Sequence, residues 1–304
     1  MKDLNIGMVG LDTSHASVFT RLLNDPDGEH HVRGGKVIKA FPGGSPDFEL
    51  SVSRIGRITE EVRSHGVEIV DTLEEAAEGT DAVLLESVDG STHLEQLRRL
   101  IVYGKPIFID KPFCLSSSDA EEMAALAAAY STSIMSSSAL RFSEGLRRVL
   151  SRQDKGAIIG ADCFGPMDMI AGQGYFWYGI HAVEMIFSIL GEGAEAVNAK
   201  WNNDHDFIVG QWRDGRIGTV RGYRSGSQQF GALVHFEQGT EYVNVAADTK
   251  PFYASLLEEI ICFFQDGSPG IELSETLEII RFIESAGASR VSGERVYMNR
   301  IHGK

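Results

Sequence analysis

A lysine held between an acid and a proline is the clearest candidate for chemistry in this sequence. Residues 104–114 read GKPIFIDKPFC, in which a short apolar run ends at Asp110 and is followed by Lys111 and Pro112. Such a run is typical of a buried strand, and open parallel sheets bind ligands beyond the carboxyl ends of their strands. Lys111 could instead be an exposed turn residue paired with Asp110. We favour a functional lysine, because a side chain fixed between an acid and a proline has lost conformational freedom.

A histidine near the start of an expected helix is the second candidate. The letters WYGIHAVE place His181 two residues after Gly179. Because the unperturbed pKa of histidine is about 6.5, an imidazole can take a hydroxyl proton near neutral pH. The alternative is a structural histidine that bonds a backbone carbonyl. The preceding aromatic residues Trp177 and Tyr178 could form a wall for a sugar ring or belong to the core.

The turn after the first expected strand has the position, but not the letters, of a phosphate-binding glycine motif. The letters GLDTSH stand where a dinucleotide-binding fold has Gly-x-Gly-x-x-Gly. Gly10 matches the first glycine, whereas Asp12 replaces the second and His15 the third. An aspartate about 4 Å from a phosphate costs ~1 kcal/mol in water and more where water is excluded. Asp12 could cap the following helix with Thr13 or Ser14, or could itself take the place of the phosphate.

The sequence predicts no metal site and does not decide between NAD and NADP. Asp12 and His15 are two potential ligands three residues apart, too few for a metal site. The second expected strand ends without the acid that holds the adenosine ribose in many dinucleotide-binding folds. Ser45, Arg54 or Arg57 could contact a ribose or a 2′-phosphate, but turn and surface roles explain the two arginines better.

The acid, lysine and proline resemble the hallmark of the glucose-fructose oxidoreductase, inositol dehydrogenase and MocA (Gfo/Idh/MocA) family. That family has this motif at the end of the fifth strand, usually with Glu where Asp110 stands; Lys111 and Pro112 match. Residues 87–93, SVDGSTH, resemble the family's loop after the fourth strand, which closes over the nicotinamide side. The lysine motif is the specific part, and the order of elements extends the resemblance over nearly the whole chain.

The other half of the resemblance lies around His181. Gly179 and His181 match the family's glycine and histidine, and Glu184 stands where the family often has Asp. The acid that the family has four residues before the histidine is Trp177 in this chain. In the family, that acid takes part in proton transfer with the histidine and hydrogen-bonds the substrate. Its replacement by Trp177 is therefore the main departure from the family's pattern.

The resemblance implies an NAD- or NADP-dependent oxidoreductase that moves a hydride between the nicotinamide and a sugar, cyclitol or similar small polyol. It implies that Lys111 bonds the reacting hydroxyl and lowers its pKa, and that His181 removes the proton. Cofactor contacts are expected at Gly10, Asp12, Thr13, Ser14, His15, Ser87, His93 and Asp110, and substrate contacts at Lys111, Trp177, Tyr178 and His181. The departures at Asp12 and Trp177 leave a second hypothesis open, a binding or regulatory protein of the same fold that has lost hydride chemistry.

The elements that must position these residues follow two patterns. From residue 4 to about 137, short apolar runs alternate with amphipathic helical stretches, which indicates βαβ units and a parallel sheet. After about residue 155, alternation of polar and apolar residues, as in TEYVNVAA, indicates antiparallel strands with one solvent-exposed face. We therefore predict an α/β protein with a Rossmann-type doubly wound parallel sheet in residues 1–140. Residues 141–304 are predicted to form an α+β substrate-binding and oligomerisation domain with a large, mainly antiparallel sheet.

The composition argues against several classes of partner. The chain has 304 residues, with 28 Lys plus Arg against 43 Asp plus Glu and a net charge of −15, which disfavours nucleic acids and anionic membranes. Its three cysteines have no metal-ligand spacing and fit a reducing compartment. Without a signal peptide or a run of ~18 apolar residues, we expect a soluble cytoplasmic protein with a small-molecule substrate. The resemblance also implies a homo-oligomer, a dimer or a tetramer.

Overall fold

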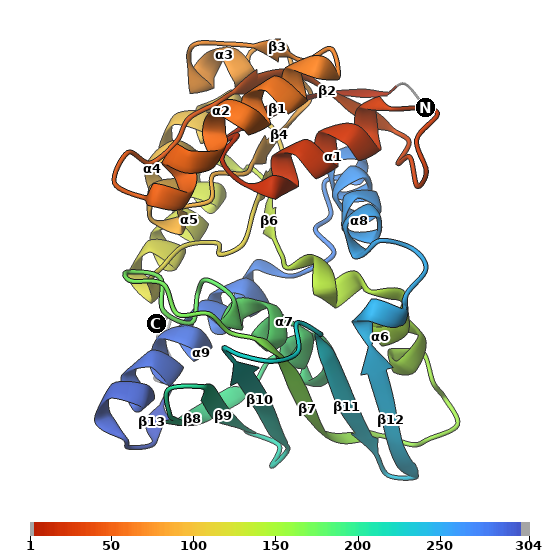
Figure 1. The fold of residues 1–304 in the computed structure, drawn as a ribbon, viewed down its shortest axis with the longest axis vertical. Coiled ribbons are helices and arrows are strands. Elements are labelled where there is room, and N and C mark those ends of the chain that lie inside the picture. The colour runs from red at the N-terminus through yellow and green to blue at the C-terminus, as the bar shows by residue number, and fades with distance from the viewer. Residues whose placement is uncertain (1–2, 299–304) are drawn as a thin grey trace. The chain divides into compact units, whose positions relative to one another are not determined.

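The computed structural model describes residues 3–298, which fold into two compact units. Unit 1 consists of residues 3–114, 118–137 and 253–273, and unit 2 of residues 115–117, 138–252 and 274–298. The chain thus leaves unit 1 near residue 138 and returns to it for one more helix near residue 253. Each unit contains a sheet of its own (Figure 1).

Unit 1 is built on a six-stranded parallel sheet in the order β3-β2-β1-β4-β5-β6. The strands are β1 (Leu4–Val9), β2 (Gly35–Phe41), β3 (Glu68–Ile69), β4 (Ala82–Leu85), β5 (Ile107–Ile109) and β6 (Ile134–Ser136). The short apolar runs form the central strands because helices cover both faces of such a sheet, and every residue of β4 and β5 is buried. The strand order reverses between β1 and β4, as in doubly wound folds. The predicted fold class is confirmed.

Helices flank the unit 1 sheet (Figure 1). They are α1 (Ser14–Asn24), α2 (Glu49–Ser64), α3 (Leu73–Ala77), α4 (His93–Leu100), α5 (Ser117–Tyr130) and α8 (Phe252–Asp266), with 3-10 turns η1 (Gly90–Thr92) and η2 (Ile101–Tyr103). α1 begins at the predicted place because the Thr13 side chain caps it, and it buries Phe19 and Leu22 on its inner face. α8 packs beside α1, with the rings of Tyr253 and Phe19 6.0 Å apart.

Unit 2 is built on a seven-stranded mixed sheet in the order β12-β11-β7-β10-β9-β8-β13. The strands are β7 (Ile158–Pro166), β8 (Ala194–Trp201), β9 (His205–Trp212), β10 (Ile217–Tyr223), β11 (Gly231–Phe236), β12 (Gly239–Asn244) and β13 (Val296–Tyr297). All neighbouring strands pair antiparallel except β7 and β10, which are parallel. The prediction of a large, mainly antiparallel sheet is confirmed.

Helices cover one face of the unit 2 sheet and leave the other to solvent. The helices are α6 (Glu144–Leu150), α7 (Gly179–Leu190) and α9 (Leu273–Ser292), with 3-10 turns η3 (Ala139–Phe142) and η4 (Val245–Ala247). α7 packs so closely on β10 that a Cβ atom at Gly218 would lie 2.6 Å from Ile186. On the same strand Val220 is buried, whereas Ile217 is 54% exposed. Within residues 3–298, no helix is long and apolar enough to cross a bilayer.

Candidate active site

The carboxyl ends of β1, β4 and β5 lie side by side at one edge of the unit 1 sheet, because β4 pairs with both other strands. Gly10 follows β1, Glu86 follows β4, and Asp110 follows β5. Ligands bind open α/β sheets at this edge, where the strand order reverses. The fold therefore brings the predicted residues Gly10 and Asp110 to one place, together with Glu86, which the sequence did not single out.

Gly10 occupies a turn that only glycine can adopt without strain. Its φ of +93° lies in the left-handed region, and a Cβ atom there would be 2.4 Å from the backbone nitrogen of Ser87. The amide of Gly10 donates to the carbonyl oxygen of Phe41 at 3.0 Å, and that of Leu11 donates to Pro42 at 2.7 Å. Gly10 thus makes the tight turn for which the first glycine of the motif is needed.

The Asp12 carboxylate points into the protein and accepts a hydrogen bond on each oxygen. The Val88 amide donates to Oδ1 at 2.9 Å, and the Ser51 hydroxyl donates to Oδ2 at 2.6 Å. Ser51 in turn accepts the amide of Ser45 at 2.8 Å. Burial raises the pKa of Asp12 although these bonds oppose the shift. Asp12 neither caps α1 nor replaces a phosphate at its start; it ties the first turn to the segments after β2 and β4.

Thr13 and Ser14 form the start of α1. The Thr13 hydroxyl accepts the backbone amide of His15 at 3.4 Å, which makes Thr13 the N-cap. Ser14 is the first residue of the helix and is exposed. Since a helix start presents backbone N–H groups and a positive partial charge, Ser14 lies where an anion can bind.

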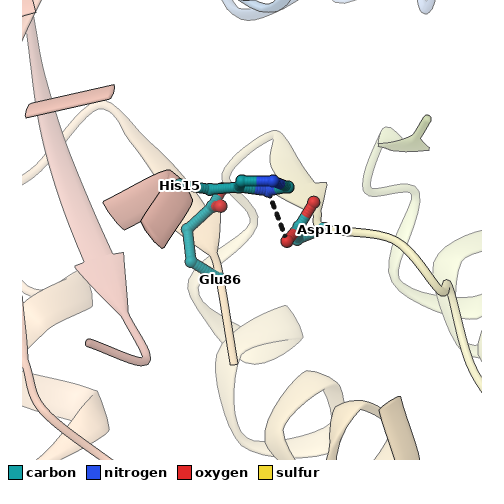
Figure 2. A group of neighbouring side chains, drawn as sticks. All are labelled: His15, Glu86 and Asp110. Carbon is teal, nitrogen blue, oxygen red and sulfur yellow. Dashed lines mark ion pairs between the residues drawn. The ribbon is translucent and has the colours of Figure 1, made fainter. Parts of the chain in front are cut away.

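The His15 ring turns inward toward Asp110 (Figure 2). Its Nδ1 lies 2.8 Å from Oδ2 of Asp110, and its Nε2 lies 2.9 Å from the Tyr253 hydroxyl on α8. The ring also stacks on Phe19, with centroids 5.7 Å apart. Burial opposes ionisation of Asp110, but the nearby His15 and Lys111 outweigh it and lower the pKa of this carboxyl.

Glu86 completes a buried cluster with His15 and Asp110 (Figure 2). One ligand atom from each residue lies within 4.8 Å of the other two. The Glu86 side chain has an exposed fraction of 0%, and neither oxygen has a hydrogen-bond partner among residues 3–298. Burial, reinforced by the charge of Asp110, raises the pKa of Glu86 well above its usual range. The sequence carried one signal for this residue, an acid directly after the apolar run DAVLL.

Lys111 is buried rather than an exposed turn residue, with an exposed fraction of 9%. Its positive charge opposes the rise in the pKa of Glu86 and helps to lower the pKa of Asp110. A buried cation can stabilise negative charge that develops on a ligand oxygen. Lys111 is therefore not the exposed turn residue of the alternative interpretation, and its functional role stays a prediction.

Ser87 lies in the loop after β4 and His93 is the first residue of α4, and both are buried. Nδ1 of His93 lies 3.1 Å from the carbonyl oxygen of Phe113, and Nε2 lies 2.8 Å from that of Ser87. His93 thereby links the segments that follow β4 and β5.

His181 lies in unit 2, in the first turn of α7. Its Nδ1 lies 2.7 Å from the Ser138 hydroxyl, and its ring makes edge contacts with Tyr178 and Phe230 at centroid distances of 5.6 and 5.5 Å. One ring nitrogen of His181 thus contacts a side-chain hydroxyl. Trp177 is 7% exposed and belongs to the core, whereas Tyr178 is partly exposed beside His181.

Glu184 and Arg141 form a buried ion pair in unit 2. Nε of Arg141 lies 2.9 Å from the Glu184 carboxylate, and the same guanidinium also pairs with Glu275. Burial raises the pKa of Glu184 in spite of this pairing. Arg141 was not predicted, because nothing in its local sequence distinguishes a buried arginine from a surface one.

The turn and the start of α1 fit a bound dinucleotide. Gly10 gives the close backbone turn, and Ser14 offers a helix start to a phosphate. The bulk and charge of Asp12 are directed at Ser51 and Val88, into the protein. Arg57 pairs with Glu61 on the exposed side of α2, in agreement with its surface interpretation.

Residues 4–137 match the model of a family described as "Oxidoreductase family, NAD-binding Rossmann fold", Gfo/Idh/MocA. The sequence matches no curated protein. Among solved structures, GenD2 from gentamicin A biosynthesis in complex with NAD is 19% identical, with a TM-score of 0.78 over 99% of this chain and 97% of that one. Scyllo-inositol dehydrogenase from Lactobacillus casei with bound NAD(H) and scyllo-inositol is 14% identical, with a TM-score of 0.80 over 98% and 99%.

A third similar structure is a myo-inositol dehydrogenase from Corynebacterium glutamicum, 15% identical with a TM-score of 0.78 over 98% of this chain and 100% of that one. At these identities the likeness shows a common fold. The family match confirms the resemblance inferred from the lysine motif. Residues 4–137 of this chain therefore match the model of the Gfo/Idh/MocA oxidoreductase family.

Proposed function

We propose that this chain is an NAD- or NADP-dependent oxidoreductase acting on an inositol or a similar polyol. The observation that carries the proposal is the buried Lys111 beside Asp110, at the sheet edge where the Gly10 turn also lies. The family match over residues 4–137 and the similar folds of inositol dehydrogenases support it.

The proposed roles follow from the chemistry of each side chain. A bound nicotinamide would supply the hydride acceptor. The Lys111 ammonium would hold the reacting hydroxyl oxygen and stabilise its negative charge. His181 would take the hydroxyl proton at Nε2, the ring nitrogen opposite the one at Ser138. Each role is carried over from the sequence resemblance.

Cofactor contacts are proposed at the residues that surround the turn. Gly10, Thr13 and Ser14 would hold the phosphates at the start of α1, with Asp12 and His15 beneath them. Ser87, His93 and Asp110 belong to the segments after β4 and β5 and would shape the nicotinamide side. Tyr178 is the aromatic residue best placed to contact substrate next to His181, since Trp177 is buried.

A charge placed at the start of α1 tests the cofactor proposal. NAD(H) and NADP(H) are titrated against the full chain while the melting temperature is followed; a ligand at 100 times its Kd stabilises the native state by about 2.7 kcal/mol. Ser14→Asp should weaken binding about tenfold, because it places an anion within ~4 Å of a phosphate. An acid at a helix start also stabilises the helix, so loss of binding cannot be ascribed to unfolding.

Ser118→Asp is the matched control, since Ser118 is an exposed residue in the first turn of α5. This variant should bind the cofactor as the wild type does. The proposal fails if neither cofactor shifts the melting temperature of the wild type at millimolar concentration, or if both variants bind equally well.

The second candidate is a binding or regulatory protein that keeps the fold without hydride chemistry. Trp177 at the position of the family's acid favours it. Absence of cofactor binding in the same titration would support this candidate.

A further inference from the structure

The cluster of His15, Glu86 and Asp110 is unusual in that its three side chains converge inside unit 1 from three different elements. His15 is on α1, Glu86 follows β4, and Asp110 follows β5. Their exposed fractions are 6%, 0% and 1%. Figure 2 shows the three side chains facing one another, and one ligand atom from each lies within 4.8 Å of the others.

Glu86 is the member of the cluster whose side-chain oxygens the described protein leaves without a hydrogen bond. Two carboxylates lie inside, and neither oxygen of Glu86 has a hydrogen-bond partner within the described chain, residues 3–298. Lys111 contributes one positive charge near both acids. Burying a carboxylate without a hydrogen bond or a counter-charge costs several kcal/mol, and buried charges in proteins are therefore paired or bind metals. A bound metal cation would give the Glu86 carboxylate the partner that it lacks among the described residues.

The orientation of His15 suits a metal ligand. Nε2 is engaged by the Tyr253 hydroxyl at 2.9 Å, which leaves Nδ1 directed toward Asp110. Nδ1 and Oδ2 are 2.8 Å apart, a separation that two ligands of one metal ion can have. Two ligands at right angles on one cation, each ~2.1 Å from it, are about 3 Å apart. Metal-bound histidines also usually have their second nitrogen held by a hydrogen bond, as Tyr253 does here.

We propose that Nδ1 of His15 and the carboxylates of Glu86 and Asp110 bind one divalent transition-metal cation. One imidazole and two carboxylates suit Zn²⁺, Mn²⁺ or Fe²⁺ and give no sulfur ligand that would select Cu⁺. The three ligands come from residues 15, 86 and 110, a spacing that no local metal motif contains. This site goes beyond the proposed function, and cation binding is measured without nicotinamide or polyol.

The test uses the full, untagged chain after treatment with a chelator and dialysis. ZnCl₂ and MnCl₂ are titrated separately by calorimetry, and bound Mn²⁺ is counted by electron paramagnetic resonance. We expect one equivalent of at least one of the two ions. Glu86→Gln keeps the size of the side chain and removes its charge, and should lower the affinity at least ~100-fold. Tyr253→Phe, which removes the hydroxyl that contacts His15, should lower it about tenfold.

Glu278→Gln is the control, since Glu278 is a partly buried glutamate of unit 2 bonded to the amides of Gly193 and Ala194. It should leave the stoichiometry and affinity unchanged. His15→Gln serves as a second ligand variant if Glu86→Gln does not fold. The proposal is overturned if the wild type binds neither ion at one equivalent, which would mean that the two acids share a proton instead. It is also overturned if the ligand variants bind as tightly as the wild type.

Discussion

Asp12→Ala should destabilise unit 1 even though Asp12 occupies a position where related folds have glycine. The substitution leaves the buried amide of Val88 and the hydroxyl of Ser51 without their acceptor. An orphaned buried donor costs ~1–3 kcal/mol. The Val88 amide is fixed in the backbone and bears this cost in full, whereas the Ser51 hydroxyl can rotate. Removing a buried carboxylate offsets part of the loss, and we expect a net loss of about 2–4 kcal/mol.

The assay must report on unit 1 by itself. The three tryptophans, Trp177, Trp201 and Trp212, all lie in unit 2, so tryptophan fluorescence is insensitive to this change. Native-state hydrogen exchange, read by mass spectrometry on peptides that cover residues 4–12 and 82–90, gives the free energy of opening locally. A loss of about 2–4 kcal/mol corresponds to exchange roughly 30- to 1000-fold faster, since 1.4 kcal/mol is tenfold.

A double-mutant cycle separates the network from a general loss of packing. Ser51→Ala removes the donor to Asp12 and the acceptor of the Ser45 amide. Because the two side chains share one hydrogen bond, the double variant should lose at least ~0.5 kcal/mol less than the sum of the single variants. Additive effects, or an Asp12→Ala variant within ~0.5 kcal/mol of the wild type, would refute the assigned role of Asp12.

Three further predictions concern unit 2. Burial raises the pKa of Glu184 above 4.5, so its stabilising contribution is present below that pH and lost as the pH rises through the folded-state value. The unfolding free energy of the wild type should therefore fall as the pH rises above 4.5, and Glu184→Gln should make this fall less steep. Tryptophan fluorescence in urea measures both slopes, and equal slopes would contradict the prediction. Arg141→Ala removes the ion-pair partner of Glu184 and Glu275. It should lower the free energy of unfolding by about 3–5 kcal/mol in the same assay. A loss below ~1 kcal/mol would be inconsistent with a buried ion pair. We propose that the chain forms a dimer or tetramer through the solvent-exposed face of the unit 2 sheet. Leu233 lies on β11 and is 36% exposed, so Leu233→Glu should give monomers, as measured by light scattering. The exposed control Val291→Glu should keep the wild-type mass, and a monomeric wild type would end this proposal.

The fold was predictable because its signals are local. Each βαβ unit shows an apolar run and a helical period within about 30 residues. The helix expected directly after the GLDTSH turn is α1, which begins at Ser14. Lys111 was predicted for the same reason, since its motif and the strand before it are contiguous.

The buried cluster was not predictable because it depends on contacts between distant segments. His15, Glu86 and Asp110 come together only once β4 is placed between β1 and β5, a pairing that the residues themselves do not encode locally. Asp12 likewise finds its partners 39 and 76 residues away. The core position of Trp177 was also not predictable, because the sequence does not distinguish an aromatic residue that lines a site from one that fills a core.

Hydride transfer itself is the most direct test of the proposed function. The full chain is mixed with NAD⁺ or NADP⁺ and a panel of inositols and related polyols, and formation of the reduced nicotinamide is followed by its absorbance. We predict turnover of at least one polyol by the wild type and a kcat at least ~100-fold lower for Lys111→Ala, the cost of removing one group that stabilises the developing negative charge. A chain that binds the cofactor but reduces none of it, or a Lys111→Ala variant that turns over at the wild-type rate, would contradict the proposed role of this lysine.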